Sequence, residues 1–139
     1  MASTQQQVVV VTGAAGFIGS RCCAAFAAAG ADVAGLDLVD PAAATASVCE
    51  QGREALTVQA DLADADQVRD CFARVLDWKG RIDVLVNMAG LYYKIPRIPF
   101  WEIDIETWNS MVANNLRTAF LCAQAAAPHM RDAGRGRIV

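Results

Sequence analysis

The sequence predicts an α/β domain in which helices cover a parallel β-sheet. Short apolar runs rich in β-branched residues alternate with longer segments at helical spacing, which is typical of strand–helix–strand units. The run at 82–88 is nearly all apolar, as a strand buried on both faces requires. The chain has 139 residues, of which 55% are hydrophobic and 19% charged, so it can form one compact core and has no room for a second domain.

Five strands are expected, each an apolar run bounded by turn residues. They lie at 8–11, 32–37, 56–60 and 82–88, with a fifth that begins at Arg137. An alanine-rich helix follows the glycine-rich turn after the first strand and ends near Gly30. We expect the sheet to be the amino-terminal half of a doubly wound, Rossmann-type fold that is incomplete on its carboxyl-terminal side.

Two longer helices carry clear signals. Asp64 can cap the first of them, Gln67 follows three residues later, and apolar residues then recur at helical spacing until Gly80. The second helical pattern runs over 105–133, with a break or offset expected near Asn114 and Asn115 and with Pro128 disfavouring an ideal helix. Two tryptophans are expected to pack at its start, Trp101 and Trp108.

Composition and charge exclude several classes of function. Twelve Lys and Arg against fifteen Asp and Glu give a net charge of −3, and no basic run could neutralise a nucleic-acid backbone. No stretch approaches the roughly 18 apolar residues of a membrane span, and residues 1–7 lack the features of a secretory signal. The five cysteines form no Cys-x-x-Cys pair, and there is a single histidine. We expect a cytoplasmic protein with reduced thiols, no metal, no membrane contact and no nucleic-acid partner.

The turn after the first strand carries three glycines at the spacing Gly-x-x-Gly-x-x-Gly: Gly13, Gly16 and Gly19. Between a strand and a helix, such residues let the backbone turn tightly and approach a pyrophosphate at the helix amino terminus. The spacing departs from Gly-x-Gly-x-x-Gly, and by itself the turn is equally consistent with a purely structural role.

Asp37 lies at the end of the second predicted strand, 24 residues after Gly13 and 18 after Gly19. An acidic residue at about this separation reaches the ribose hydroxyls of a bound dinucleotide, and it would repel a 2′-phosphate. Leu38 offers no positive charge to bind such a phosphate. The pattern therefore favours NAD over NADP, and the alternative is that Asp37 is simply a solvated strand end.

The motifs together resemble the short-chain dehydrogenase/reductase family over essentially the whole chain. The resemblance rests on Thr12-Gly-Ala-Ala-Gly-Phe-Ile-Gly19, Asp61-Leu62, Asn87-Met-Ala-Gly90 and Asn115-Leu116. Asn87 to Gly90 is similar to the family's Asn-Asn-Ala-Gly with one substitution, whereas the glycine spacing is that of the family's longer, epimerase-like branch. The resemblance implies that the cofactor is bound by Thr12, Gly13, Gly16, Phe17, Ile18, Gly19, Asp37, Asp61, Leu62, Asn87, Ala89 and Gly90.

Asn115 matches the helix asparagine that, in this family, helps to hold a water of the proton relay. The resemblance thus implies a catalytic role for Asn115, with Asn114 as the alternative one residue away. Without the resemblance, either asparagine would be read as a helix break that bonds its own backbone.

The serine and the Tyr-x-x-x-Lys pair on which family catalysis depends are missing from these 139 residues. The two tyrosines, Tyr92 and Tyr93, precede Lys94 in a proline-containing loop, where they cannot share a helix face with it. Because a domain seldom ends as an apolar strand enters the sheet, we expect a truncated chain, inactive alone.

The activity implied by resemblance is hydride transfer between a nicotinamide cofactor, NAD rather than NADP, and a secondary alcohol or ketone. The complete form is expected to be a homo-oligomer that uses the long helix around 116–127. Two other hypotheses stay open: a stand-alone dinucleotide-binding module without turnover, and a structural domain without a ligand.

Overall fold

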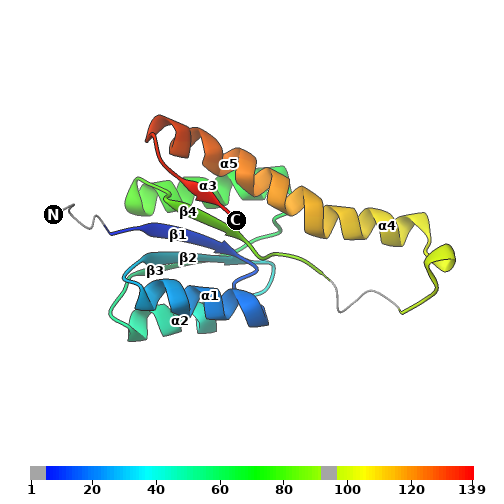
Figure 1. Cartoon of the computed structure of the whole chain (residues 1–139), viewed down its shortest axis with the longest axis horizontal. Helices are drawn as coiled ribbons and strands as arrows, with labels where there is room; N and C mark the ends of the chain where they lie inside the picture. The colour runs from blue at the N-terminus through cyan, green and yellow to red at the C-terminus, as the bar shows by residue number, and fades with distance from the viewer. Residues whose placement is uncertain (1–5, 92–96) are drawn as a thin grey trace.

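A computed structural model describes residues 6–91 and 97–139, which form one layer of β-sheet between two layers of helices (Figure 1). The sheet is parallel throughout, with the strand order β3-β2-β1-β4-β5. Its strands are β1 (Val8–Thr12), β2 (Asp32–Asp37), β3 (Ala55–Gln59), β4 (Val84–Asn87) and β5 (Arg137–Ile138). The predicted α/β class, the Rossmann-type sheet and the place of each strand are confirmed, with boundaries that differ by one or two residues.

Two helices cover each face of the sheet (Figure 1). On one face lie α1 (Phe17–Ala28) and α2 (Ala42–Glu50), and on the other α3 (Ala65–Lys79) and α5 (Thr118–Asp132). Strand β1 is fully buried because successive side chains point to opposite faces: Val8 and Val10 pack into the α3/α5 core, and Val9 and Val11 into the α1/α2 core. Burial on both faces explains why its sequence does not alternate.

Helix α2 was not assigned from the sequence. Its nine residues bury the small side chains Ala44 and Thr45 together with Val48, so the helix lacks the pronounced apolar stripe by which α3 is recognised. The start of α3 follows the prediction, because Asp64 Oδ1 accepts hydrogen bonds from the backbone N–H groups of Asp66 (2.8 Å) and Gln67 (3.2 Å).

The long helical segment keeps its direction through the expected offset. Helix α4 (Ile105–Val112) passes into a π-helical turn, η2 (Ala113–Arg117), which leads directly into α5, and Pro128 lies inside α5. A short 3₁₀ turn, η1 (Phe100–Glu102), precedes α4. The expected packing of Trp101 and Trp108 is wrong, because these side chains are 81% and 56% exposed.

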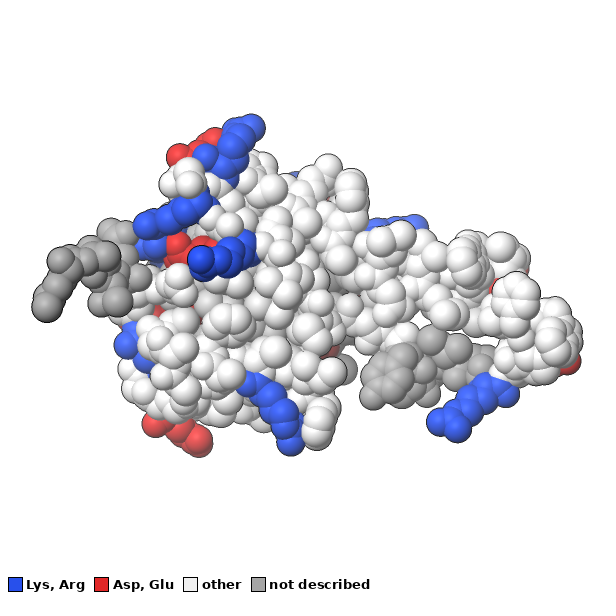
Figure 2. Space-filling view, viewed as in Figure 1, with Lys and Arg blue, Asp and Glu red and all other residues white. Residues whose placement is uncertain are grey.

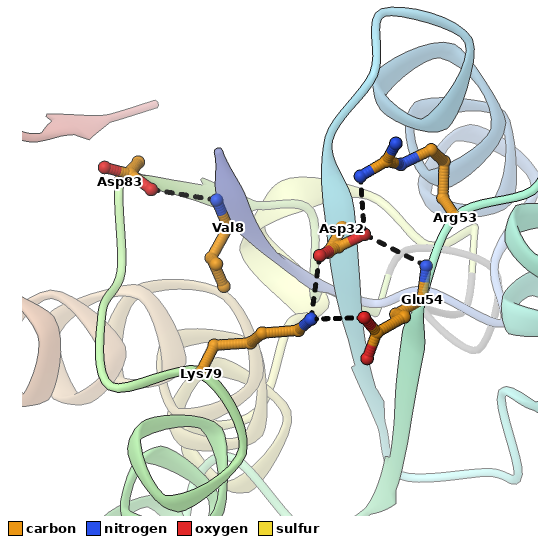
Figure 3. A network of polar contacts seen from close by, with 6 residues as sticks. All are labelled: Val8, Asp32, Arg53, Glu54, Lys79 and Asp83. Atoms are coloured by element: carbon orange, nitrogen blue, oxygen red, sulfur yellow. Dashed lines mark hydrogen bonds and ion pairs between the residues drawn. The ribbon is translucent and has the colours of Figure 1, made fainter. Parts of the chain in front are cut away.

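Charged groups tie the amino-terminal edge of the sheet together (Figure 3). Asp32, whose side chain is 2% exposed, pairs with Arg53 Nη2 (3.1 Å) and Lys79 Nζ (2.9 Å). On the other side of β1, Asp83 Oδ2 accepts a hydrogen bond from the backbone N–H of Val8 (2.8 Å). This edge lies opposite the strand ends at which a cofactor is expected, so we assign these groups to stability.

Candidate functional site: a cleft at the carboxyl ends of the strands

A cleft of about 380 Å³ opens at the carboxyl ends of the strands. It lies where the strand order reverses between β1 and β4, which is where open α/β sheets bind their ligands. Its lining residues come from four loops and from the η2–α5 junction: Gly13, Ala15, Gly16, Asp37, Leu38, Val39, Asp61, Leu62, Met88, Ala89, Gly90, Leu91, Asn114 and Thr118.

The glycine turn is packed so closely that side chains would not fit. A Cβ on Gly19 would lie 2.0 Å from the carbonyl oxygen of Gly13, and a Cβ on Gly13 would lie 2.6 Å from that of Met88. Gly13 also has a φ of +66°, a backbone angle that residues other than glycine rarely adopt. The turn therefore needs glycine at these two positions for its own packing, whether or not a ligand is bound.

Helix α1 begins at the edge of this cleft. Its cap residue is Gly16, which has no side chain to accept a hydrogen bond from the N–H groups of the first turn. The side chains of Phe17 and Ile18 are 72% and 58% exposed, and Arg21 lies over the Phe17 ring. An uncapped helix start with its partial positive charge is suited to an anionic group such as a phosphate.

Asp37 joins the end of β2 to the glycine turn. Its Oδ2 accepts a hydrogen bond from the backbone N–H of Ala15 (2.9 Å), and its Oδ1 accepts one from that of Val39 (3.1 Å). A carboxylate has about four acceptor positions, so hydroxyl donors in the cleft could still bind. Asp37 is thus a fixed negative charge on the cleft wall rather than a freely solvated strand end.

Thr12 connects the two strands beneath the cleft. Its side chain is buried, and Oγ1 accepts hydrogen bonds from the backbone N–H groups of Met88 (3.0 Å) and Ala89 (3.1 Å) while donating to the carbonyl of Val86 (3.4 Å). One hydroxyl therefore fixes the end of β1 against the segment that follows β4. It holds the cleft floor without lining the cleft itself.

The segment after β3 contributes Asp61 and Leu62. Asp61 Oδ1 accepts a hydrogen bond from the backbone N–H of Ala63 (2.9 Å), and Gln67 Oε1 accepts one from the N–H of Asp61 (2.9 Å). Leu62 is buried in the core on the α3/α5 face. These contacts hold the Asp61 carboxylate at the start of α3, where it faces the cleft beside the other lining residues.

Asn115 lies beside the cleft rather than in its lining. Its Nδ2 donates hydrogen bonds to the carbonyls of Met111 (2.9 Å) and Leu91 (3.3 Å). A Cβ on Gly90 would lie 2.6 Å from Asn115 Oδ1, so a glycine is needed there. Asn115 thereby fixes the chain that leaves β4 against the π-helical turn.

Asn87 turns toward β5 instead of the cleft. Its backbone N–H (2.8 Å) and its Nδ2 (3.3 Å) both donate to the carbonyl of Val139, and its Oδ1 is buried without a hydrogen-bond partner among the described residues. Its position suits the bracing role that the family resemblance implies.

Seven of the residues predicted for the site line the cleft together. They are Gly13, Gly16, Asp37, Asp61, Leu62, Ala89 and Gly90. The other seven lining residues were not among the predicted site residues: Ala15, Leu38, Val39, Met88, Leu91, Asn114 and Thr118. Ala15 and Met88 lie within the quoted motifs, and Asn114 was the alternative to Asn115. Val39, Leu91 and Thr118 reach the cleft because of loop and helix geometry that a local sequence pattern does not encode. Tyr92, Tyr93 and Lys94 fall outside the described residues.

Other chemistries find no support in the part of the chain that the structure describes. Burial raises the pKa of the Cys23 thiol to about 11 and that of Cys122 to about 12, so neither is an activated nucleophile. Residues 6–91 and 97–139 contain no group of three or more side chains arranged to bind a metal ion. None of the helices in these ranges has the length and apolar character to cross a bilayer.

Comparison with known proteins identifies the family. The short chain dehydrogenase family model matches residues 7–139. The chain is 34% identical over 134 residues to 2-dehydro-3-deoxy-D-gluconate 5-dehydrogenase of Escherichia coli, covering 96% of this chain and 52% of that protein. It is 37% identical over 142 residues to 3-oxoacyl-[acyl-carrier-protein] reductase of Synechocystis, covering 100% of this chain and 56% of that protein.

Solved structures agree. An NAD⁺-bound xylitol dehydrogenase superposes with a TM-score of 0.88 at 31% identity, over 95% of this chain and 51% of that one. The fold is shared with these proteins, and the chain belongs to the short-chain dehydrogenase/reductase family. It spans about half the length of the curated relatives it matches.

Proposed function

We propose that the chain is the cofactor-binding part of an NAD-dependent oxidoreductase that transfers hydride between the nicotinamide and a secondary alcohol or ketone. The observation that carries the proposal is the cleft itself, in which the glycine turn and Asp37 share one wall. Family membership supports an enzyme over a stand-alone binding module, because the related proteins are dehydrogenases and reductases.

The residues present fit a dinucleotide. Gly13, Gly16 and Gly19, with the uncapped start of α1, would hold the pyrophosphate, and Asp37 would accept hydrogen bonds from the adenosine ribose. Asp61 and Leu62 would contact the adenine. When bound, the nicotinamide supplies or accepts the hydride, whereas the residues described here bind and orient it. The proposed role of Asn115 is the one that the family resemblance implies, to help hold a water of the proton relay.

Replacement of Asp37 tests the cofactor preference. In Asp37→Asn the fixed charge is gone, so NAD should bind more weakly and the ratio of NADP to NAD affinity should rise about tenfold, since repulsion of a 2′-phosphate is worth ~1.4 kcal/mol or more at this distance scale. Isothermal titration of both dinucleotides into the parent and variant chains measures the ratio. Asp77→Asn, which removes an exposed carboxylate of α3 away from the cleft, is the charge-matched control.

A second test concerns turnover. We expect the purified 139-residue chain to bind NAD but to show no alcohol-dependent rise in NADH absorbance, because it carries no Tyr-x-x-x-Lys pair to polarise the substrate oxygen. A longer protein that includes this chain and a Tyr-x-x-x-Lys pair should show turnover in the same assay. Sustained reduction of NAD by the 139-residue chain alone would contradict the assignment of catalysis to residues outside it.

An oligomeric complete protein also remains a prediction, to be measured by sedimentation. The surface over α4 is largely uncharged (Figure 2), and large apolar side chains are exposed along the long helical segment, among them Trp108, Leu116 and Phe120. Such a surface is suited to burial against another subunit. The cytoplasmic location likewise stays a prediction from the sequence.

A further inference from the structure

One corner of the cleft is formed where the start of α3 approaches the junction between η2 and α5. Helices α3 and α5 pack side by side on the same face of the sheet, so their amino-terminal ends meet at its carboxyl edge (Figure 1). This brings Asp61, just before α3, and Asn114, in the π-helical turn before α5, into the lining of one cleft. Asp61 follows β3, which lies beyond β2 and Asp37 from the glycine turn in the strand order, on the side where a dinucleotide that places its ribose at Asp37 would place its base.

Asn114 presents an acceptor at this corner. Its Nδ2 donates to the carbonyl oxygen (2.8 Å) and to the hydroxyl (3.3 Å) of Ser110, one turn earlier. The Nδ2 group is therefore held within the helix. Its Oδ1 has no hydrogen-bond partner among residues 6–91 and 97–139, and the side chain is half-buried in the cleft wall. A fixed amide with a free oxygen differs from a solvated asparagine, which would rotate.

The corner contains more free hydrogen-bond acceptors than free donors. The Asp61 carboxylate keeps Oδ2 free of hydrogen bonds in the described chain, and Thr118 Oγ1 is engaged with the carbonyls of Asn114 and Asn115. No Lys or Arg is among the described residues that line the cleft. Two acceptors on different elements match a group with two hydrogens to donate, such as the exocyclic amino group of adenine.

We propose that Asn114 is a base-specificity residue: its Oδ1 accepts one hydrogen bond from the 6-amino group of the adenine, while Asp61 accepts the other. The inference rests on the proposed function, since it assumes that a dinucleotide binds in the cleft. A 6-oxo purine would place its carbonyl oxygen, an acceptor, against Asn114 Oδ1 and the Asp61 carboxylate. Asn114 should therefore weaken the binding of such a base relative to adenine. Asn115, one residue on, is turned to Leu91 and does not take part.

The test compares NAD with nicotinamide hypoxanthine dinucleotide, which has an oxygen in place of the 6-amino group. Titration into the 139-residue chain should show at least about tenfold tighter binding of NAD. In Asn114→Ala the affinity for NAD should fall about fivefold, and that for the hypoxanthine analogue by less than about twofold. Alanine favours helix, and circular dichroism will verify that the variant is folded.

The control is Asn109→Ala, which removes an exposed asparagine of α4 that is not among the cleft residues and should leave both affinities unchanged. Equal losses for the two dinucleotides in Asn114→Ala would mean that Asn114 only supports the helix, and would overturn the inference. So would unchanged NAD affinity. Failure of the parent chain to bind either dinucleotide would instead overturn the proposed cofactor function, and this inference with it.

Discussion

Gly19→Ala should destabilise the chain by about 3 kcal/mol and abolish NAD binding. The added methyl would lie 2.0 Å from the Gly13 carbonyl oxygen and 2.7 Å from its carbonyl carbon, and both are backbone atoms. Overpacking against movable side chains costs about 1–3 kcal/mol, and a backbone that cannot move aside puts this substitution at the upper end. Helix α1 must shift from the turn, and the close approach to a pyrophosphate is lost. Urea unfolding and titration with NAD measure the two effects.

Gly52→Ala separates steric overlap from the general effect of replacing a glycine. Gly52 has a φ of +74°, but a Cβ there would meet nothing within 4 Å. Its replacement should cost only the backbone strain of about 1 kcal/mol and leave NAD affinity unchanged. If Gly19→Ala were as stable as the parent chain and bound NAD equally well, the close contact described for the turn would be wrong.

The fold was predictable where the sequence of an element carries a strong local signal. Burial on both faces makes β1 and β4 apolar runs, and a capping aspartate with an apolar stripe marks α3. Helix α2 was not predicted because the residues that pack it against α1 and the sheet are mostly small and do not form a recognisable apolar stripe. The exposure of Trp101 and Trp108 could not be read from the sequence either, since an apolar side chain indicates burial without saying against what.

The part of the site that was predictable is the wall formed by the glycine turn and Asp37, because its geometry is set by the backbone close to these residues. Glycines at a strand–helix turn and an aspartate at the next strand end leave a local pattern. The opposite wall leaves none: Asn114 reaches the cleft through the π-helical turn and Thr118 through the packing of α5, both of which depend on tertiary structure. The sequence suggested an offset at Asn114 and Asn115 and the family resemblance favoured Asn115 for the site, whereas it is Asn114 that lines the cleft.

The second large effect is expected at the opposite edge of the sheet, where Asp32 holds three elements together. Its carboxylate binds Arg53 and Lys79, and Oδ1 accepts a hydrogen bond from the backbone N–H of Glu54 (3.0 Å), while Lys79 also pairs with Glu54 Oε1 (2.9 Å) (Figure 3). Burial alone would raise the pKa of Asp32, but the hydrogen bonds from Lys79 and Glu54 outweigh it and hold the pKa below the usual 3.8.

Asp32→Ala should therefore lower the free energy of unfolding by about 3 kcal/mol at pH 7, the lower end for a broken buried pair, because Arg53 and Lys79 remain 24% and 18% exposed and can turn to water. Asp32→Asn keeps an acceptor and should cost about 2 kcal/mol. Exposed Asp77→Asn is the control and should change little.

The pH dependence of unfolding tests separately whether the charge of Asp32 contributes to the stability difference between the parent chain and Asp32→Asn. A carboxyl whose pKa is lower in the folded chain than in the unfolded one, ~3.9, stabilises the fold above about pH 4, and this contribution is lost as the pH falls through the folded value. The difference in unfolding free energy between the parent chain and Asp32→Asn should thus be full at pH 7 and narrow below pH 4. A difference that stayed constant down to pH 2.5 would show that the charge of Asp32 contributes nothing, and that its shape and hydrogen bonds alone hold the edge.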